Sequence, residues 1–168
     1  MPIENQLLLF TASNVHFTTH YAGKSVKAIR GSSVNFTWRF NGSFRFIKWG
    51  FMSPDDQGQV LPANVLVSVR GSDGTVTLSG PSSYSRRVRG SWDGQTAPGQ
   101  VIFKLSSIKM QDDRLFGCNI EPRNLAARKA IDTVQLIVIG EYYNKKPYGD
   151  QILKHRQFSP NLASVEIE

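Results

Sequence analysis

The sequence predicts an all-β fold, a two-sheet antiparallel sandwich. Apolar and polar residues alternate in short segments such as "VNFTW", in which Val34, Phe36 and Trp38 are the apolar members. This period of two is typical of strands with one buried face. Gly and Ser clusters separate the segments, and none shows a sustained apolar period of 3.6 residues. Short strands at this spacing are typical of antiparallel sandwiches.

Each candidate strand is placed by this alternation and by the turn signals around it. In chain order the segments are 15–19, 24–29, 34–38, 44–51, 64–69, 75–78, 87–92, 101–106, 115–120 and 133–139. In the segment 44–51 we expect Ile47, Trp49 and Phe51 to face inward. The sequence "RGSDG" between the fifth and sixth segments predicts a hairpin turn.

Length and charge limit the classes of protein to consider. A chain of 168 residues predicts one domain with a substantial core. The formal net charge is +7, with 16 Lys/Arg and 9 Asp/Glu in residues 1–140 and four of each in 141–168. No block of like charges occurs, so we expect a solvated basic surface, with a dedicated polyanion site as the alternative.

The two ends of the chain differ from the middle. Residues 1–11 include the apolar run "LLLF" without a basic flank, which indicates a leader remnant or an edge segment. Residues 141–168 have the composition of a linker or juxtamembrane stalk, with a short helical turn expected at 152–157. The domain is expected to span 12–140. No apolar run is long enough to cross a bilayer, so membrane attachment would require segments outside this sequence.

A specific resemblance comes from the run "FKLSSIKMQDDRLFGCNIEP". It resembles the corner between strands E and F of a variable-type (V-set) immunoglobulin domain, with Leu105, Ile108, Asp112, Phe116 and Cys118 at the family's offsets. Trp49 follows Trp38 by 11 residues, as the family's strand-C tryptophan follows its first cysteine. The resemblance implies a V-type immunoglobulin-like sandwich with extra C′ and C″ strands.

The departures from the family are equally specific. Trp38 stands where the family has its strand-B cysteine, so the inter-sheet disulfide is absent and Cys118 is expected to be a buried free thiol. Phe116 replaces the tyrosine of the family's tyrosine corner and lacks its hydroxyl. We expect Trp38 to fill the space between the sheets against Trp49 and Cys118. Its indole N–H needs an acceptor, which the sequence does not identify.

The resemblance also implies a structural ion pair. "RVRGS" at 87–91 resembles the start of strand D, so Arg87 is expected to pair with Asp112. Arg86 and Arg89 are competing partners, and Arg89 is expected on the same face as Arg87. A partly exposed pair of this kind contributes under about 1 kcal/mol.

Cysteine usage and glycosylation signals indicate different compartments. A chain without a disulfide suits the cytosol. Two N-glycosylation acceptors, Asn35 in "NFT" and Asn41 in "NGS", indicate secretion. Together with the V-set resemblance they favour an extracellular or cell-surface glycoprotein.

Enzymatic chemistry has little support in the sequence. His16, His20 and His155 are scattered, and no spacing fits a metal site or an activated nucleophile. We therefore expect no enzyme activity, no catalytic or metal-ligating residue and no cofactor. No nucleic-acid-binding module is present either.

The remaining hypothesis is a recognition domain. V-set domains generally bind proteins, and the chain is also similar to cnidarian surface immunoglobulin proteins, including allorecognition receptors. This similarity implies cell adhesion or self/non-self recognition, with another cell-surface protein or a second copy as partner. The alternative is a soluble binder of an anionic ligand such as an acidic glycan. The expected binding surface lies on the front sheet and its loops and comprises Arg39, Phe40, Phe44, Arg45, Phe46, Lys48, Arg123, Arg128 and Lys129. Burial of Phe40 and Phe44 beneath the loop is the competing interpretation of that end.

Overall fold

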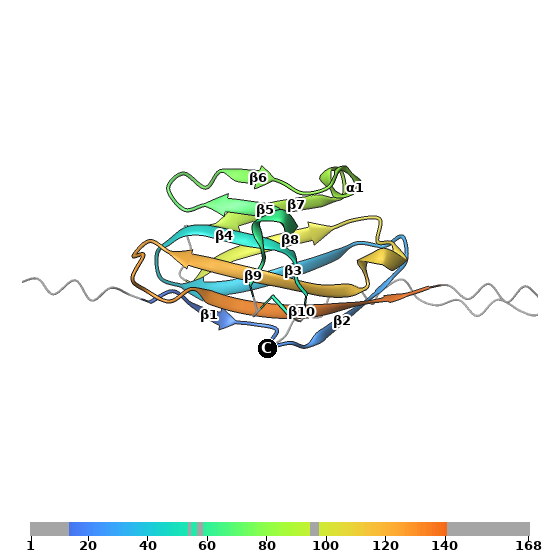
Figure 1. The fold of residues 1–168 in the computed structure, drawn as a ribbon, viewed down its shortest axis with the longest axis horizontal. Helices are drawn as coiled ribbons and strands as arrows, with labels where there is room; N and C mark the ends of the chain where they lie inside the picture. Colours follow the sequence, from blue (N-terminus) through green and yellow to red (C-terminus); the bar gives the residue numbers. More distant parts are fainter. Residues whose placement is uncertain (1–13, 54, 57–58, 95–97, 141–168) are drawn as a thin grey trace, which may run out of the picture.

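A computed structural model describes residues 14–140 except 54, 57–58 and 95–97, and Figure 1 shows its fold. The expectations for residues 1–11 and 141–168 lie outside the described residues. The strands are β1 (His16–Thr19), β2 (Ser25–Ile29), β3 (Val34–Asn41), β4 (Phe44–Phe51), β5 (Val65–Arg70), β6 (Val76–Leu78), β7 (Val88–Asp93), β8 (Gly99–Leu105), β9 (Arg114–Pro122) and β10 (Ala130–Ile139). The predicted segments coincide with these strands to within a few residues. The sequence did not predict the short helical elements η1 (Pro62–Asn64), α1 (Ser82–Ser85) and η2 (Met110–Asp112).

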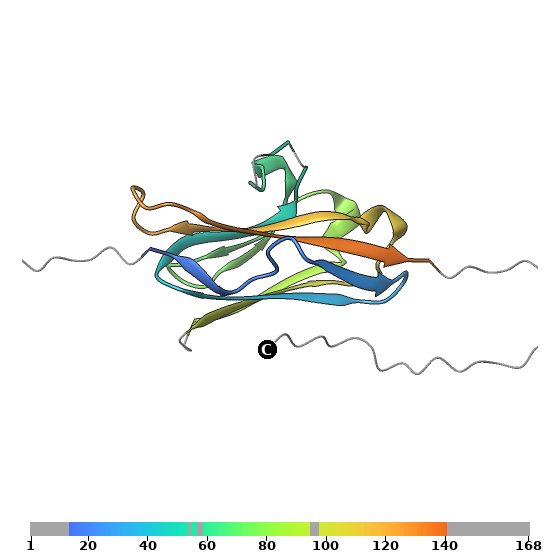
Figure 2. The same cartoon turned by 90° about the horizontal axis from the view of Figure 1, so that it is seen from below.

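The strands form two layers, seen edge-on in Figure 2. The back sheet has the order β1-β3-β8-β7, and the front sheet has the order β2-β10-β9-β4-β5-β6. All neighbouring strands are antiparallel except β2 and β10, which are parallel. Between β1 and β2 the chain therefore crosses from the back sheet to the front sheet. This architecture is the predicted two-sheet sandwich.

Trp38 lies fully buried between the sheets, and the structure identifies the acceptor of its indole N–H. Nε1 of Trp38 on β3 donates to Oδ2 of Asp132 on β10, at 2.6 Å. The same carboxylate accepts the backbone N–H groups of Tyr21 and Ala22, where the chain crosses between the sheets. Asp132 lies opposite Cys118 in the register of β10 and β9. The indole and carboxylate thus join the two sheets beside the position where the family has a disulfide.

Cys118 is a free, fully buried thiol. Burial, and to a lesser extent the charge of Asp132, raises the pKa of this thiol well above its usual value. Because the thiolate is the reactive form, the thiol of the native protein should react slowly with disulfide reagents. We expect dithionitrobenzoate to label less than about a tenth of the thiol at pH 8 before urea is added, and all of it afterwards. Rapid labelling of the folded protein would contradict this placement.

Arg87 and Asp112 form an ion pair at the end of the sandwich that carries α1. The sequence predicted a partly exposed pair, and this was wrong, because the side chains are only 9% and 0% exposed. Asp112 also accepts hydrogen bonds from the Tyr84 hydroxyl and the Lys109 backbone N–H. Arg89 does not share the face of Arg87, since it is exposed and donates to the carbonyl of Val88. The helical turn over Tyr84 encloses the pair in a way that strand alternation does not predict.

Candidate interaction surface

The outer face of the front sheet is divided by the connection between β4 and β5. Gly50 and Gly117 are opposite each other in β4 and β9. A Cβ on Gly117 would lie 2.0 Å from the Met52 sulfur, and one on Gly50 would lie 2.1 Å from the Asn64 carbonyl oxygen. Met52 therefore packs directly on the strand backbone, together with Val60 and Val65 in a second buried cluster. Figure 2 shows the connection projecting from this face of the sandwich.

The other half of this face, where β4 begins and β9 ends, remains accessible. Phe46 and Lys48 point outward there, as the sequence predicted, and both are half-buried. Phe46 lies opposite Glu121 of β9 and Arg70 of β5. We call this region the free end of the front sheet. It consists of Arg45, Phe46, Lys48, Arg70, Glu121, Ile131 and the β9–β10 connection.

Glu121 is the electrostatic centre of the free end. Its carboxylate accepts from Lys48 Nζ at 2.6 Å and from Arg45 at 3.2 Å. Burial alone would raise the pKa of this carboxyl group, but the hydrogen bonds from Lys48 and Arg45 and the charges of Lys48 and Lys129 lower it below its usual value. Both Arg45 and Lys48 also lie over the ring of Phe46, at 5.3 and 5.8 Å from its centroid. The ring and the carboxylate together orient two cations on the surface.

The β9–β10 connection adds three more cations to this end. Arg123, Arg128 and Lys129 are all exposed, as expected from the sequence. The backbone N–H of Arg123 donates to the Ser43 carbonyl, which fixes the start of the connection against the β3–β4 turn. Ile131, at the start of β10, is 38% exposed beside them. The structure therefore brings together Arg45, Phe46, Lys48, Arg123, Arg128 and Lys129.

The remaining three residues of the expected surface do not belong to it. Phe40 and Phe44 are 3% and 6% exposed, so their assignment to the surface was wrong. Phe40 continues the inward alternation of β3, and its ring packs edge-on against Phe44, which packs edge-on against Trp92. Arg39 is exposed but lies on the back sheet, where its Nε donates to Gln100. The expected loop is only a two-residue turn, Gly42–Ser43, so these residues lie in strands.

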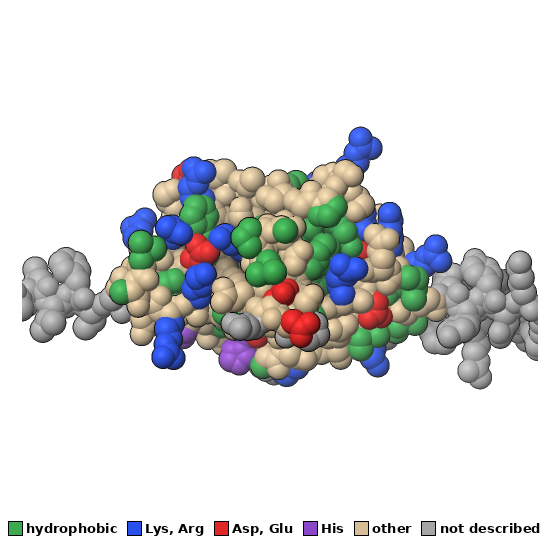
Figure 3. Space-filling view, in the orientation of Figure 1, with side chains coloured by type: hydrophobic (Ala, Val, Ile, Leu, Met, Phe, Trp, Pro, Cys, Tyr) green, Lys and Arg blue, Asp and Glu red, His purple; other side chains and the backbone are tan. Residues whose placement is uncertain are grey.

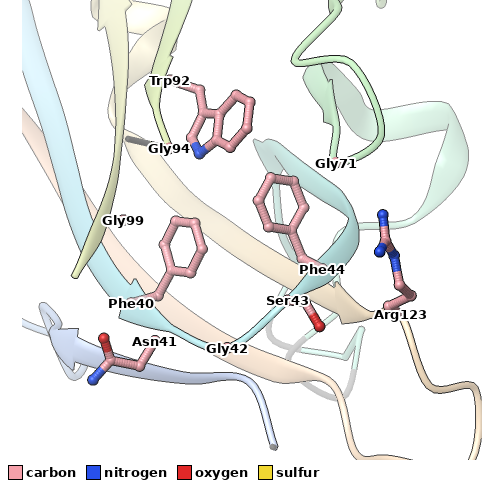
Figure 4. A pocket seen from close by; sticks show the side chains of 10 residues that line it. All are labelled: Phe40, Asn41, Gly42, Ser43, Phe44, Gly71, Trp92, Gly94, Gly99 and Arg123. Carbon is pink, nitrogen blue, oxygen red and sulfur yellow. The ribbon is translucent and has the colours of Figure 1, made fainter. Parts of the chain in front are cut away.

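A shallow depression of about 310 Å³ lies at this turn (Figure 4). Phe40, Phe44 and Trp92 line it together with several glycines, and Arg123 lies at its edge. Asn41 also borders it, with its side chain directed away from the three rings (Figure 4). Gly94 and Gly99, which are among its lining residues, stand on either side of an undescribed part of the chain, so we assign the depression no ligand.

Both predicted glycosylation acceptors are exposed. Asn35 lies in the back sheet, opposite Lys104, and Asn41 lies at the last position of β3. A glycan on Asn35 would cover the back sheet and leave the front sheet accessible. Glycosylation of these two asparagines stays a prediction from the sequence.

The sequence did not identify Glu121, Arg70, Ile131 or Asp132. The first three face the free end only because of the registers of β5, β4, β9 and β10. Asp132 interacts with Trp38, from which it is 94 residues distant in the chain. An acidic residue next to an alternating apolar strand is the one signal that could have indicated a buried partner for Asp132.

Two further features of the described residues are relevant to function. No group of three or more His, Cys, Asp or Glu side chains able to hold a metal ion occurs within the described ranges. In the same part of the chain, no helix has the length and apolar character needed to cross a membrane.

Comparison with known proteins supports the fold. No protein-family model matches the chain, and no curated protein matches it in sequence. The structure of murine CRIg is similar, with a TM-score of 0.54 and 17% identity, covering 75% of this chain and 98% of that one. A second similar structure, from a study of multimeric cell-adhesive interactions of VGSC beta subunits, has a TM-score of 0.52 and 16% identity, covering 68% and 90%. The chain therefore has an immunoglobulin-like sandwich fold without an inter-sheet disulfide.

Proposed function

We propose that this chain is an extracellular recognition domain that binds another cell-surface protein through the free end of its front sheet. The role would be cell adhesion or self/non-self recognition. The observation that carries the proposal is the division of the front sheet. Met52 and its neighbours cover one half, whereas the other half exposes cations around Phe46 and Ile131. Arginine with aromatic side chains is enriched at the cores of protein interfaces.

The fold comparisons support the same class of function. One similar structure concerns cell-adhesive interactions of VGSC beta subunits, and fold likeness makes a comparable role reasonable for this chain. Glycans on Asn35 and Asn41 would agree with a cell-surface location, and one on Asn35 would direct binding to the front sheet. A second copy of the domain is the first partner to test, because beads that display the domain can be mixed with one another and no other protein is needed.

The test is adhesion of beads that display the domain. We expect beads carrying the wild type to bind partner-bearing cells or one another, and the double variant Phe46→Ala/Arg128→Ala to lose at least about tenfold of that binding. Phe46 supplies apolar contact and fixes two cations, so its truncation should affect both. The comparison is valid only if the double variant has the same melting temperature as the wild type.

The matched control is Ile102→Ala/Lys104→Ala on the back sheet. Like Phe46 and Arg128, this pair combines a half-buried apolar side chain on a strand with an exposed cation. We expect the control to adhere like the wild type. Equal losses in both variants, or full adhesion by the front-sheet variant, would show that the contact lies elsewhere.

A further inference from the structure

The free end of the front sheet carries an excess of positive charge. Lysine and arginine side chains gather at the left of Figure 3, over the start of β4, the end of β9 and the β9–β10 connection. Six cations lie in this region, and we call them the cationic end: Arg45, Lys48, Arg70, Arg123, Arg128 and Lys129. Only Glu121 and Asp73 form ion pairs with any of them among the described residues. Six positive charges against two negative ones leave a clear excess.

Half of these cations have no direct side-chain contact with an acidic group among the described residues. No hydrogen bond or ion pair of the Arg123, Arg128 or Lys129 side chain occurs among the described residues. Arg70 has only a 3.5 Å contact with Asp73, and both side chains are about half exposed. Exposed ion pairs of this kind are weak and easily replaced. These four side chains are therefore available to an incoming anion.

The cationic end is extended rather than compact. Arg70, Phe46 and Glu121 form one cross-strand row over β5, β4 and β9, with Arg45 and Lys48 beside Phe46. Neighbouring strands are about 4.8 Å apart, so this row spans roughly 10 Å before the β9–β10 connection extends it. Lys129 lies close enough to lower the pKa of Glu121, so the positive charge continues beyond β9. Cations spread along an extended surface in this way fit a linear ligand with repeated negative charges.

Part of the surface is oriented before any ligand binds. Phe46 and Glu121 hold Arg45 and Lys48 in place, which reduces the side-chain entropy lost on binding. The β9–β10 connection contributes flexible Arg and Lys side chains that adapt to variable spacing of anionic groups.

From these observations we propose that the cationic end binds a linear sulfated polysaccharide of the extracellular surface. The choice of a polysaccharide over a nucleic acid rests on the extracellular location in the proposed function. Lys and Arg side chains form charge-assisted hydrogen bonds to anionic oxygens, and several such contacts in a row give additive, salt-dependent affinity. The polysaccharide would be a ligand in addition to the protein partner.

The experiment measures binding of the full 168-residue chain to immobilised heparin as the sulfated probe. We compare the wild type with Arg123→Glu/Arg128→Glu/Lys129→Glu and with the control Arg86→Glu/Arg89→Glu/Lys104→Glu. The control residues are exposed and lie near α1 or on the back sheet, and both triples change the net charge equally. At about 0.15 M NaCl we expect the first triple to lose at least tenfold in affinity and the control less than threefold.

Three outcomes would overturn the proposal. If the wild type does not bind heparin at physiological salt, the chain does not bind sulfated polysaccharides. If both triple variants lose equal affinity, binding depends on the net charge of the protein and not on the cationic end. If single-stranded DNA of matched charge binds equally well, and the variants weaken its binding in the same way, the surface binds polyanions in general and has no preference for a sulfated polysaccharide. A milder triple, Arg123→Gln/Arg128→Gln/Lys129→Gln, replaces the first if charge reversal prevents folding. Heparin binding without bead adhesion would contradict only the proposed function, and adhesion without heparin binding would contradict only this inference.

Discussion

Replacing Trp38 with alanine should lower the free energy of unfolding by about 3–5 kcal/mol, the range for truncating a large buried aromatic. Trp38 is fully buried and contacts the rings of Tyr21 and Phe103. The change also removes the donor to Asp132, whose buried carboxylate would keep only two backbone N–H partners. Urea denaturation followed by far-UV circular dichroism measures the loss.

Trp38→Phe separates packing from hydrogen bonding in this test. Phenylalanine keeps much of the ring contact but cannot donate to Asp132, so we expect a loss of about 1–3 kcal/mol, typical for leaving a charged buried acceptor short of one donor. Trp92→Ala is the control, because Trp92 is only partly buried. A loss under about 1 kcal/mol for Trp38→Ala would show that the indole does not join the sheets.

Trp38→Cys provides an independent check on the family alignment. If position 38 corresponds to the family's strand-B cysteine, the new thiol should form a disulfide with Cys118 under oxidising conditions. A bridge closing a loop of this length stabilises by roughly 4 kcal/mol in the chain-entropy model. The oxidised variant should therefore be more stable than its reduced form, which mass spectrometry and urea denaturation can establish together.

Alternation along the chain predicted the strands well, because burial on one face repeats every second residue whatever the partners are. Phe44–Phe51 has the same bounds as the predicted segment. The same rule explains the error at Phe40, because the inward series of Phe36 and Trp38 simply continues to the end of β3. The expected binding surface instead places Phe40 in a loop. A tight Gly42–Ser43 turn leaves no loop to hold it, and Gly42 has a positive φ of 98°.

The candidate surface was predictable only in part. The outward positions of Phe46 and Lys48 follow from local alternation, and exposure of the β9–β10 cations follows from their composition. Glu121 becomes their centre only through pairing between β4 and β9, whose register the sequence does not specify. The covering of Gly50 and Gly117 by Met52 and Asn64 depends on the path of a long connection, for which the sequence carries no periodic signal.

Replacing Arg87 with alanine should destabilise the fold by about 3–5 kcal/mol, as expected when one member of a buried ion pair is removed. The cost arises from Asp112, which is fully buried and would retain a negative charge with only the Tyr84 hydroxyl and the Lys109 N–H as donors. Arg87 also lies over the Tyr84 ring, at 4.9 Å from its centroid, so packing of α1 should loosen as well.

Arg86→Ala is the matched control for this prediction. Arg86 is the adjacent arginine and is exposed, so its loss should change stability by less than about 0.5 kcal/mol. In the double variant Arg87→Ala/Asp112→Ala, the buried charge is gone and the total loss should be smaller than the sum of the two single losses. Additive losses would mean that the two side chains stabilise the fold independently. In that case the ion pair would not hold this end of the sandwich together.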